Sequence, residues 1–240
     1  MVYVNSSLDS LARRSRSPNK AFIILRENGL SVVLLGLFLV TAVGQVAFGL
    51  GAYNEERVEE GRATVTVLTY LTSGHFLEAL FENWESEFLQ MGLFVLLSAA
   101  LIQKGSAESK PMEEGFEGDE DPREHRNDEG APWPVRRGGW VLWIYERSLA
   151  AAFAALFLLS WVLHAFGGLM QNNEERSMRG LPSQGLFEFV ASSQFWFESF
   201  QNWQSEFLAV LSIVVLTIFL RHRGSPQSKP VAAPHAKTGS

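Results

Sequence analysis

The stretch GLSVVLLGLFLVTAVGQVAFGLGA, residues 29–52, decides the fold class of this 240-residue chain. A second stretch of the same kind, SLAAAFAALFLLSWVLHAFGGLM, fills residues 148–170, and neither contains a charged side chain. About 20 apolar residues are enough to cross the hydrocarbon core of a bilayer as a helix. A helix on the surface of a soluble protein would need a polar face, which neither stretch offers. Both stretches are therefore predicted to span a membrane.

The rest of the composition excludes several kinds of site. The chain has no cysteine, which excludes a disulfide framework, thiolate catalysis and thiolate metal ligation. Its net charge of −6 gives no case for a nucleic-acid partner. The histidines show no metal-ligand spacing, and there is no Gly-rich phosphate loop or nucleophile–base pair. We therefore predict that the chain is not an enzyme and holds no metal or cofactor.

The sequence repeats itself without a gap after 119 residues. The matched blocks are NEER at 54–57 and 173–176, FENWESEFL at 81–89 with FQNWQSEFL at 200–208, and GSAESKP at 105–111 with GSPQSKP at 224–230. Three separated blocks in one register indicate the duplication of a unit that holds two helices and a loop. The same register pairs the first apolar stretch with the one in mid-chain. The first stretch is therefore predicted to be a retained span and not a cleaved signal peptide.

Each repeat carries a second apolar stretch that is too short to cross a bilayer by itself. Its uncharged part, 88–103 or 207–220, would give a helix of about 24 or 21 Å, against about 30 Å of hydrocarbon. The second helix is therefore expected to begin earlier, within the preceding FxNWxSE block. The chain is thus predicted to be an all-α membrane protein with four transmembrane helices, near residues 29–52, 81–103, 148–170 and 200–221.

The positions of lysine and arginine predict the orientation of these spans. Basic residues precede the first span, flank the central linker and follow the fourth span, whereas the two outer segments hold few. Lysine and arginine are enriched in cytoplasmic loops, so both termini and the linker are expected in the cytoplasm. Two spans per repeat make the copies parallel, related by a pseudo-two-fold axis along the membrane normal.

Composition also predicts the domain boundaries. Polar segments rich in Gly, Pro and acidic residues cannot bury enough apolar surface to fold, so they are expected to be disordered. Residues 63–77 form either an extended outer loop or a re-entrant piece. The predicted parts are a disordered cytoplasmic N-terminus at 1–21, a first repeat at 22–111, an acidic disordered cytoplasmic linker at 112–139, a second repeat at 140–223 and a disordered cytoplasmic tail at 224–240.

The duplicated FxNWxSEF block carries the candidate polar site. On a helix, its aromatic residues fall on one face and its polar residues on the opposite face. The aromatic residues, expected to anchor the helix at the membrane interface, are Phe81, Trp84, Phe200 and Trp203. The polar face consists of Asn83, Ser86 and Glu87 in the first repeat, and Asn202, Ser205 and Glu206 in the second.

The two copies of the block differ in charge. The first block's Glu82 and Glu85 match Gln201 and Gln204 in the second. Glu87 and Glu206 both keep their charge, and one hypothesis is that they face each other across the pseudo-symmetry axis and attract a cation or a proton. The favoured alternatives are that each carboxylate sets the depth of its helix at the interface, or that Asn83 and Glu87 bind loop backbone groups.

A further polar pair lies inside the first and third spans. Gln45 and His164 occupy matched positions in the two repeats. An intramembrane histidine can titrate near neutral pH. Because the matched residue is glutamine, a polar contact between helices is the favoured role.

The FxNWxSEF element, followed by an apolar span and the GSxxSKP block, resembles a bacterial family of uncharacterised integral membrane proteins. The resemblance covers residues 26–111 and 146–230. It implies a protein of the bacterial cytoplasmic membrane with four spans, and it implies no activity, cofactor or site residue.

These observations lead to two functional hypotheses. The first is a non-enzymatic, multi-pass inner-membrane protein with a structural, envelope or interaction role. Its expected partners are the lipid bilayer, a second copy of the chain and a protein bound through the cytoplasmic linker. The alternative is a small cation or proton channel or transporter that uses Glu87 and Glu206.

Overall fold

The computed structural model describes residues 20–112 and 115–239, which form helices and loops and, within those ranges, no strand. The elements in chain order are α1 (Lys20–Glu59), α2 (Val67–Leu71), α3 (Gly74–Ala100), the 3-10 helix η1 (Glu117–Asp119), α4 (Trp133–Arg137), α5 (Gly139–Tyr145), α6 (Ser148–Met178), α7 (Leu186–Val190) and α8 (Ser193–Phe219). The chain divides into two compact units, Met1–Val67 and Leu68–Ser240. The predicted N-terminal segment 1–21 lies almost wholly outside the described residues.

The first compact unit consists mainly of α1. The backbone of Asn28 leaves the helical region (φ −122°, ψ 19°), so a kink separates the first turns from the uncharged stretch that follows. The helix ends where charged residues return. There the Asn54 side chain donates to Val65 O at 3.2 Å and accepts from Val65 N at 2.7 Å. These two hydrogen bonds hold the loop after α1 against the end of the helix.

The second repeat makes the same contacts 119 residues later. Asn173 donates to Gln184 O at 3.1 Å and accepts from Gln184 N at 2.7 Å. The helix bounds recur as well, since α7 and α8 begin and end 119 residues after α2 and α3. Ser73 and Ser192 cap the N-termini of α3 and α8 by accepting hydrogen bonds from the backbone NH groups of Phe76 (3.2 Å) and Phe195 (3.3 Å). The short helix α2 occupies part of the segment 63–77, whose conformation the sequence left open.

Three helices are long and apolar enough to cross a membrane, namely Arg26–Glu59 within α1, Ser148–Met178 and Ser193–Phe219. The prediction of an all-helical chain with apolar spans is therefore confirmed for these three. The predicted span near 81–103 corresponds to α3, which is a 27-residue helix ending at Ala100. Its first half carries four glutamates, so its apolar part is too short for α3 to qualify by composition.

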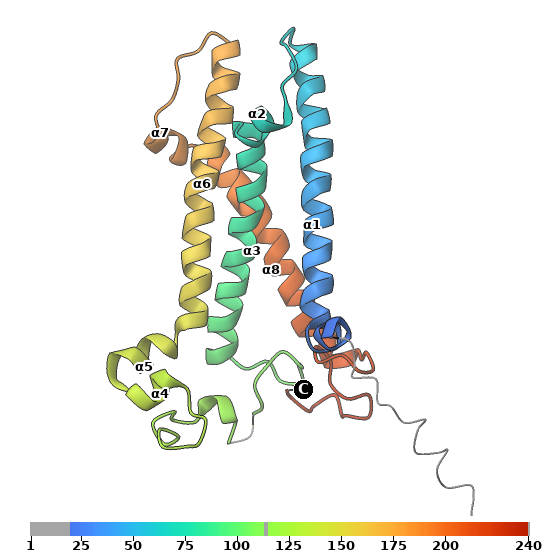
Figure 1. The fold of residues 1–240 in the computed structure, drawn as a ribbon, viewed down its shortest axis with the longest axis vertical. Helices are drawn as coiled ribbons and strands as arrows, with labels where there is room; N and C mark the ends of the chain where they lie inside the picture. The colour runs from blue at the N-terminus through green and yellow to red at the C-terminus, as the bar shows by residue number, and fades with distance from the viewer. Residues whose placement is uncertain (1–19, 113–114, 240) are drawn as a thin grey trace, which may run out of the picture. The chain divides into compact units, whose positions relative to one another are not determined.

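In the second compact unit, α3 packs against both α6 and α8 (Figure 1). Helices α3 and α6 run antiparallel, and their backbones approach so closely that some positions leave no room for a side chain. A Cβ added at Gly167 would lie 2.5 Å from the backbone nitrogen of Glu78, and one at Gly74 would meet the backbone of Gln171. Small residues allow this kind of approach between membrane helices. The backbones of α3 and α6 therefore touch near the ends that face the α6–α7 loop.

The apolar core of this unit lies beside the same contact. Ala165 of α6, Phe189 of α7 and Phe195 of α8 are buried together. The Phe195 ring meets Phe189 edge-on at 5.7 Å and Trp161 edge-on at 5.6 Å between centroids. Buried aromatic pairs of this geometry are favourable beyond their area. The short helix α7 thus packs beside the middle of α6 and against α8.

The segments after α3 and α8 form hydrogen-bonded turns that contact each other. The Lys229 ammonium donates to the carbonyl oxygens of His235 and Lys237, both at 2.9 Å, and to that of Gly105. Gly239 N donates to Ser106 O at 2.9 Å. The predicted domain boundaries, and the predicted disorder of the linker and tail, stay predictions.

Candidate functional site

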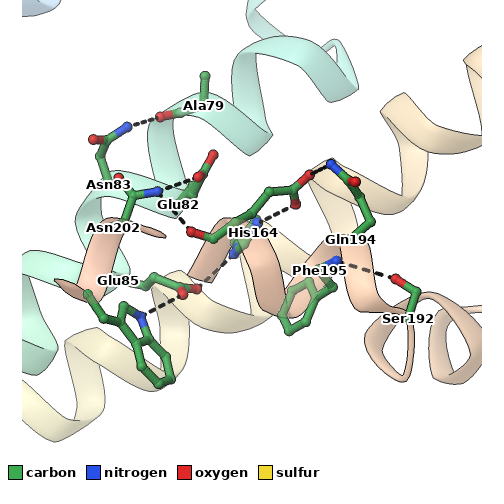
Figure 2. Close-up of polar contacts among 11 residues, drawn as sticks. Ala79, Glu82, Asn83, Glu85, His164, Ser192, Gln194, Phe195 and Asn202 are labelled. Carbon is green, nitrogen blue, oxygen red and sulfur yellow. Dashed lines mark hydrogen bonds and ion pairs between the residues drawn. The ribbon is translucent and has the colours of Figure 1, made fainter. Parts of the chain in front are cut away.

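A fully buried histidine lies where α3, α6 and α8 meet. His164, in the middle of α6, has no exposed side-chain area. Its Nδ1 is 2.9 Å from Oε2 of Glu85 on α3, as Figure 2 shows. Its Nε2 is 3.5 Å from Oε2 of Glu198 on α8. One imidazole therefore joins the carboxylates of two other helices.

Glu85 is as deeply buried as the histidine, and both of its oxygens have partners. Oε2 bonds to His164, and Oε1 accepts a hydrogen bond of 3.1 Å from the indole NH of Trp203. A buried carboxylate is costly unless such donors satisfy it. With Glu85 ionised, Nδ1 of the imidazole must carry the hydrogen that joins them. This side of the site is closed.

On the other side of the imidazole, the hydrogen-bonding capacity of Nε2 is less well satisfied. The 3.5 Å between His164 Nε2 and Glu198 Oε2 exceeds the usual range of a hydrogen bond. Both atoms are buried, and neither has a hydrogen-bond partner among the described residues. The imidazole ring stacks on Phe195, with ring centroids 4.8 Å apart. The ring is thus held in place while one of its nitrogens faces a carboxylate across a gap.

A row of carboxylates leads from this site toward the α6–α7 loop. Glu78, Glu82 and Glu85 are spaced by four and three residues on α3, so they lie on one helix face. Glu82 accepts a hydrogen bond from the side chain of Asn202, which Figure 2 also shows. Glu78 lies over Gly168, because a Cβ added there would be 3.1 Å from Glu78 Oε1. Both carboxylates are half-buried, whereas Glu85 is fully buried.

The charges of this cluster cannot all be present without strong repulsion. His164 can contribute one positive charge, but Glu85, Glu198, Glu82 and Glu78 would contribute four negative ones. Uncompensated charge is expensive in a medium of low polarity. Neighbouring groups of this kind exchange protons as a coupled set rather than one by one. The arrangement is therefore suited to holding a variable number of protons. No group of three or more His, Asp or Glu side chains within the described ranges has a geometry that would hold a metal ion.

A family model described as a domain of unknown function (DUF6766) matches residues 21–240. The chain belongs to this family. Neither a curated protein nor a solved structure matches it. The expected membership of an uncharacterised family is confirmed, while the bacterial origin stays a prediction. The DUF6766 match covers every residue of the histidine cluster.

The DUF6766 chain places the predicted polar residues on the same helices but gives them mostly local partners. Asn83 donates to Ala79 O at 2.8 Å, and Asn202 donates to Glu198 O at 3.1 Å. Ser86 and Ser205 donate to the backbone oxygens three residues earlier, at 2.7 and 2.8 Å. Such bonds satisfy a polar side chain within its own helix. Of these side chains, Asn202 also reaches the histidine cluster, through Glu82.

The two carboxylates predicted to form an ion site lie outside these hydrogen bonds. Glu87 is exposed and Glu206 is half-buried. The charge of Glu87 is close enough to act on Glu206. Their role in binding a cation or proton stays a prediction. Gln45, the match of His164, lies in α1 of the first compact unit.

The predicted aromatic anchors pack against neighbouring rings. Trp84 meets Phe81 edge-on at 5.5 Å, and Trp203 meets Phe200 edge-on at 5.4 Å. Trp203 has a further role in the DUF6766 chain, since its indole NH binds Glu85. That these rings lie at the membrane interface stays a prediction.

Sequence reasoning missed four members of the cluster. Glu78, Glu82, Glu85 and Glu198 match Phe197, Gln201, Gln204 and Ala79 in the other repeat. A signal was present, because these glutamates and His164 are titratable in one copy only. The charge that both copies retain points instead to Glu87 and Glu206.

Proposed function

We propose that this chain is a multi-pass membrane protein that takes up and releases protons at the His164 cluster. The observation that carries the proposal is a fully buried imidazole, 2.9 Å from Glu85 and 3.5 Å from Glu198, in a helix apolar enough to cross a membrane. Ionisable groups inside a bilayer are costly, and they commonly mark proton or ion sites. Histidine changes its charge near neutral pH more readily than any other side chain.

Protonation of His164 would change the contact between α6 and α8. A protonated imidazole has an Nε2–H that can donate to Glu198, which would shorten the present 3.5 Å separation. A neutral imidazole with its hydrogen on Nδ1 directs a lone pair at the same carboxylate, which pushes the two groups apart. The number of bound protons therefore sets how tightly the outer part of α8 packs against α6.

The proposed membrane architecture has four spans, with α3 as the fourth. The 27 residues of α3 would extend about 40 Å, enough to cross the hydrocarbon core. Three of the four glutamates that lower its average hydropathy, Glu78, Glu82 and Glu85, point into the contacts with α6 and α8. The cost of a charged residue in a membrane helix depends on that direction. The identical bounds of α3 and α8 in the two repeats support the same conclusion.

The proposed repeats are parallel and related by a pseudo-two-fold axis. Residues at matched positions can meet each other only near such an axis. Glu87 acts electrostatically on its match Glu206. With its amide oriented to donate, Gln227 lies 2.6 and 3.0 Å from the carboxylate oxygens of its match Glu108. One matched pair in contact, in the turns after α3 and α8, and one pair of matched charges that act on each other support an axis there.

We propose a bacterial inner-membrane location, and the placement of lysine and arginine supports an orientation with both termini in the cytoplasm. On this proposal the chain is not an enzyme. A second copy of the chain, or a protein bound through the linker, would respond to the change in packing between α6 and α8.

A second candidate role is structural, and one observation favours it. Both oxygens of Glu85 are satisfied, so Glu85, His164 and Trp203 can act as a polar clamp that joins three helices. In that role the cluster would keep one protonation state over the physiological range. The predicted channel through Glu87 and Glu206 is a third possibility and uses different residues.

The test is infrared spectroscopy of the full chain in lipid nanodiscs, recorded between about pH 5 and pH 9 around the ordinary range of histidine. We expect a band of protonated carboxyl groups whose intensity changes with pH. Glu85→Gln and Glu198→Gln should remove part of that change, and His164→Gln should shift its midpoint. Gln is the matched residue at two of these positions, so these changes borrow side chains from the other repeat.

Two outcomes would contradict the proposal. A carboxyl band independent of pH would leave the polar clamp as the better description. A pH-dependent band that disappears only in the double variant Glu87→Gln, Glu206→Gln would assign the protons to the predicted channel site.

A further inference from the structure

We infer that protons reach the His164 cluster from one membrane face only, the face on which the α6–α7 loop lies. This inference rests on the proposed function and adds the side from which the site is loaded. A site loaded from one side reports the pH of that side. It does not by itself conduct protons across the membrane.

The two routes from His164 to water differ in length. Along α6, the first charged residue toward the α6–α7 loop is Glu174, ten residues after His164, and the first in the other direction is Arg147, seventeen residues before it. At 1.5 Å per residue these separations are about 15 Å and about 26 Å. The shorter route leads toward the α6–α7 loop and the beginning of α3, where Gly74 meets Gln171.

The short route is lined by groups that can carry protons. On α3 these are Glu82 and Glu78, on α8 Glu198, and at the outer end of α6 Glu175, which accepts from Gln171 at 3.4 Å. Exposure rises along this route. His164 and Glu85 have no exposed side-chain area, the Glu198 side chain is 15% exposed, and Glu78 and Glu82 are half-buried. Carboxylates spaced one helical turn apart can pass a proton directly or through one water.

The remaining element packed near the imidazole contributes no titratable group. The short helix α7 presents Phe189 to the core beneath it. Its own carboxylate, Glu188, is exposed and accepts a hydrogen bond from Gln184 at 3.2 Å. Glu188 therefore lies on the correct face of the bundle but outside the route.

Beyond Glu87 of α3 and Glu206 of α8, the long route has no proton carrier among the described residues. The segments 88–100 of α3, 148–163 of α6 and 207–219 of α8 contain no charged residue and no histidine. The hydroxyl groups of Ser98 and Ser212 donate to backbone oxygens of their own helices, at 3.3 and 2.7 Å, which satisfies them within the helix. Thr217, near the end of α8, also contacts the hydroxyl of Ser106 in the turn after α3, at 3.1 Å.

An aromatic layer closes the site on the side of the long route. Trp203 holds Glu85 through its indole NH. Its ring packs edge-on against Phe157 of α6, with centroids 6.3 Å apart, and against Phe200. Phe157 is seven residues before His164, so this layer lies beyond the imidazole as seen from the loop. Apolar rings exclude the water that a proton would need.

The inference is tested with the full chain in proteoliposomes and pH steps applied to one face at a time. The chain has no cysteine, so a cysteine introduced at the exposed Ser183 can be labelled with an impermeant reagent to measure orientation. The signal is the tryptophan fluorescence of the wild type minus that of Trp203→Phe, since the Trp203 indole binds Glu85. We expect the signal to follow the pH on the loop face and to ignore the pH on the other face.

Variants test the two halves of the argument. The double variant Glu78→Gln, Glu82→Gln should slow the response by about a hundredfold, the usual effect of removing a proton-transfer group. Glu188→Gln, a carboxylate on the same face outside the route, should leave the rate unchanged. Phe157→Ala should open the aromatic layer, so that the signal also follows the pH on the far face.

The outcomes separate the inference from the proposed function. An equal response to both faces, or a response to the far face alone, overturns one-sided loading while leaving proton binding intact. No response to either face, with insertion shown by the Ser183 label, overturns proton binding at this site and with it the inference.

Discussion

Gly167→Ala would place a methyl group where α3 and α6 have no room for one. The added Cβ would lie 2.5 Å from Glu78 N, and 2.9 Å from both the carbonyl carbon and the Cβ of Leu77. Ordinary van der Waals contacts begin near 3.4 Å. Two of these neighbours are backbone atoms, which cannot rotate away. The two helices would therefore have to separate by about 1 Å.

This separation would act on the histidine site as well as on packing. His164 is three residues before Gly167, almost one helical turn away. A displacement of about 1 Å would lengthen the 2.9 Å contact between His164 and Glu85 beyond the hydrogen-bond range. Overpacking costs about 1–3 kcal/mol, and losing a hydrogen bond to a charged group costs about 1.5–3 kcal/mol. We therefore expect a loss of at least about 2.5 kcal/mol, or about 5–10 °C in Tm.

The assay is thermal unfolding of the purified chain in nanodiscs, together with the NMR signal of the hydrogen on His164 Nδ1. Gly185→Ala is the matched control, because its added Cβ meets no atom within 4 Å and its φ is an ordinary −85°. We expect Gly167→Ala to lower Tm and to move or broaden the histidine signal, and Gly185→Ala to change neither. A Gly167→Ala chain with unchanged Tm and an unchanged histidine signal would refute close packing as the support of the site.

Three further predictions concern the loops and the linker. Hydrogen bonds to Asp128 and Glu120 raise the pKa of His125. These contacts should therefore be complete below about pH 6.5 and should be lost as the pH rises through the raised pKa. NMR titration should show that Asp128→Asn lowers this pKa. Lys229→Met removes the donor that joins three backbone carbonyls, so hydrogen exchange should become faster in the turns 105–107 and 235–239, and unchanged exchange there would contradict the contact. Asn173→Ala removes two hydrogen bonds to the loop after α6, at about 1 kcal/mol each; exchange should rise around residues 182–185, and a loop as protected as in the wild type would count against the clamp.

The sequence predicts a span most directly where composition and direction agree. The stretches 29–52 and 148–170 contain no charged residue, so a helix through either can face lipid over most of its surface. For α3 the two differ, because Glu78, Glu82 and Glu85 lower the average hydropathy yet point toward other helices. Composition records which residues a segment contains, and only packing shows which way they point. The beginning of α3 at Gly74, seven residues before the predicted start, follows from the same contacts.

The polar site could be predicted only in part for a related reason. His164 was identified, because one polar residue in an apolar run is visible in any sequence. Its partners lie 79 residues earlier, at Glu85, and 34 residues later, at Glu198. No periodicity within a single helix connects such positions. In a comparison of the two repeats, only the positions that differ connect them.

Positions that are alike in the two repeats support the fold, whereas positions that differ form the histidine cluster. Asn54 and Asn173 are alike, and both hold a loop to the end of a helix. Positions of this kind are needed twice, because each copy must fold. Titratable groups in a bilayer carry a cost of several kcal/mol each, so a second buried cluster would weaken the chain without being needed for folding. Replacement of His164 and Glu85 by glutamine in the other copy keeps a polar side chain of similar reach and removes that cost. A duplicated fold with one asymmetric cluster is therefore what selection for a single proton site would leave behind.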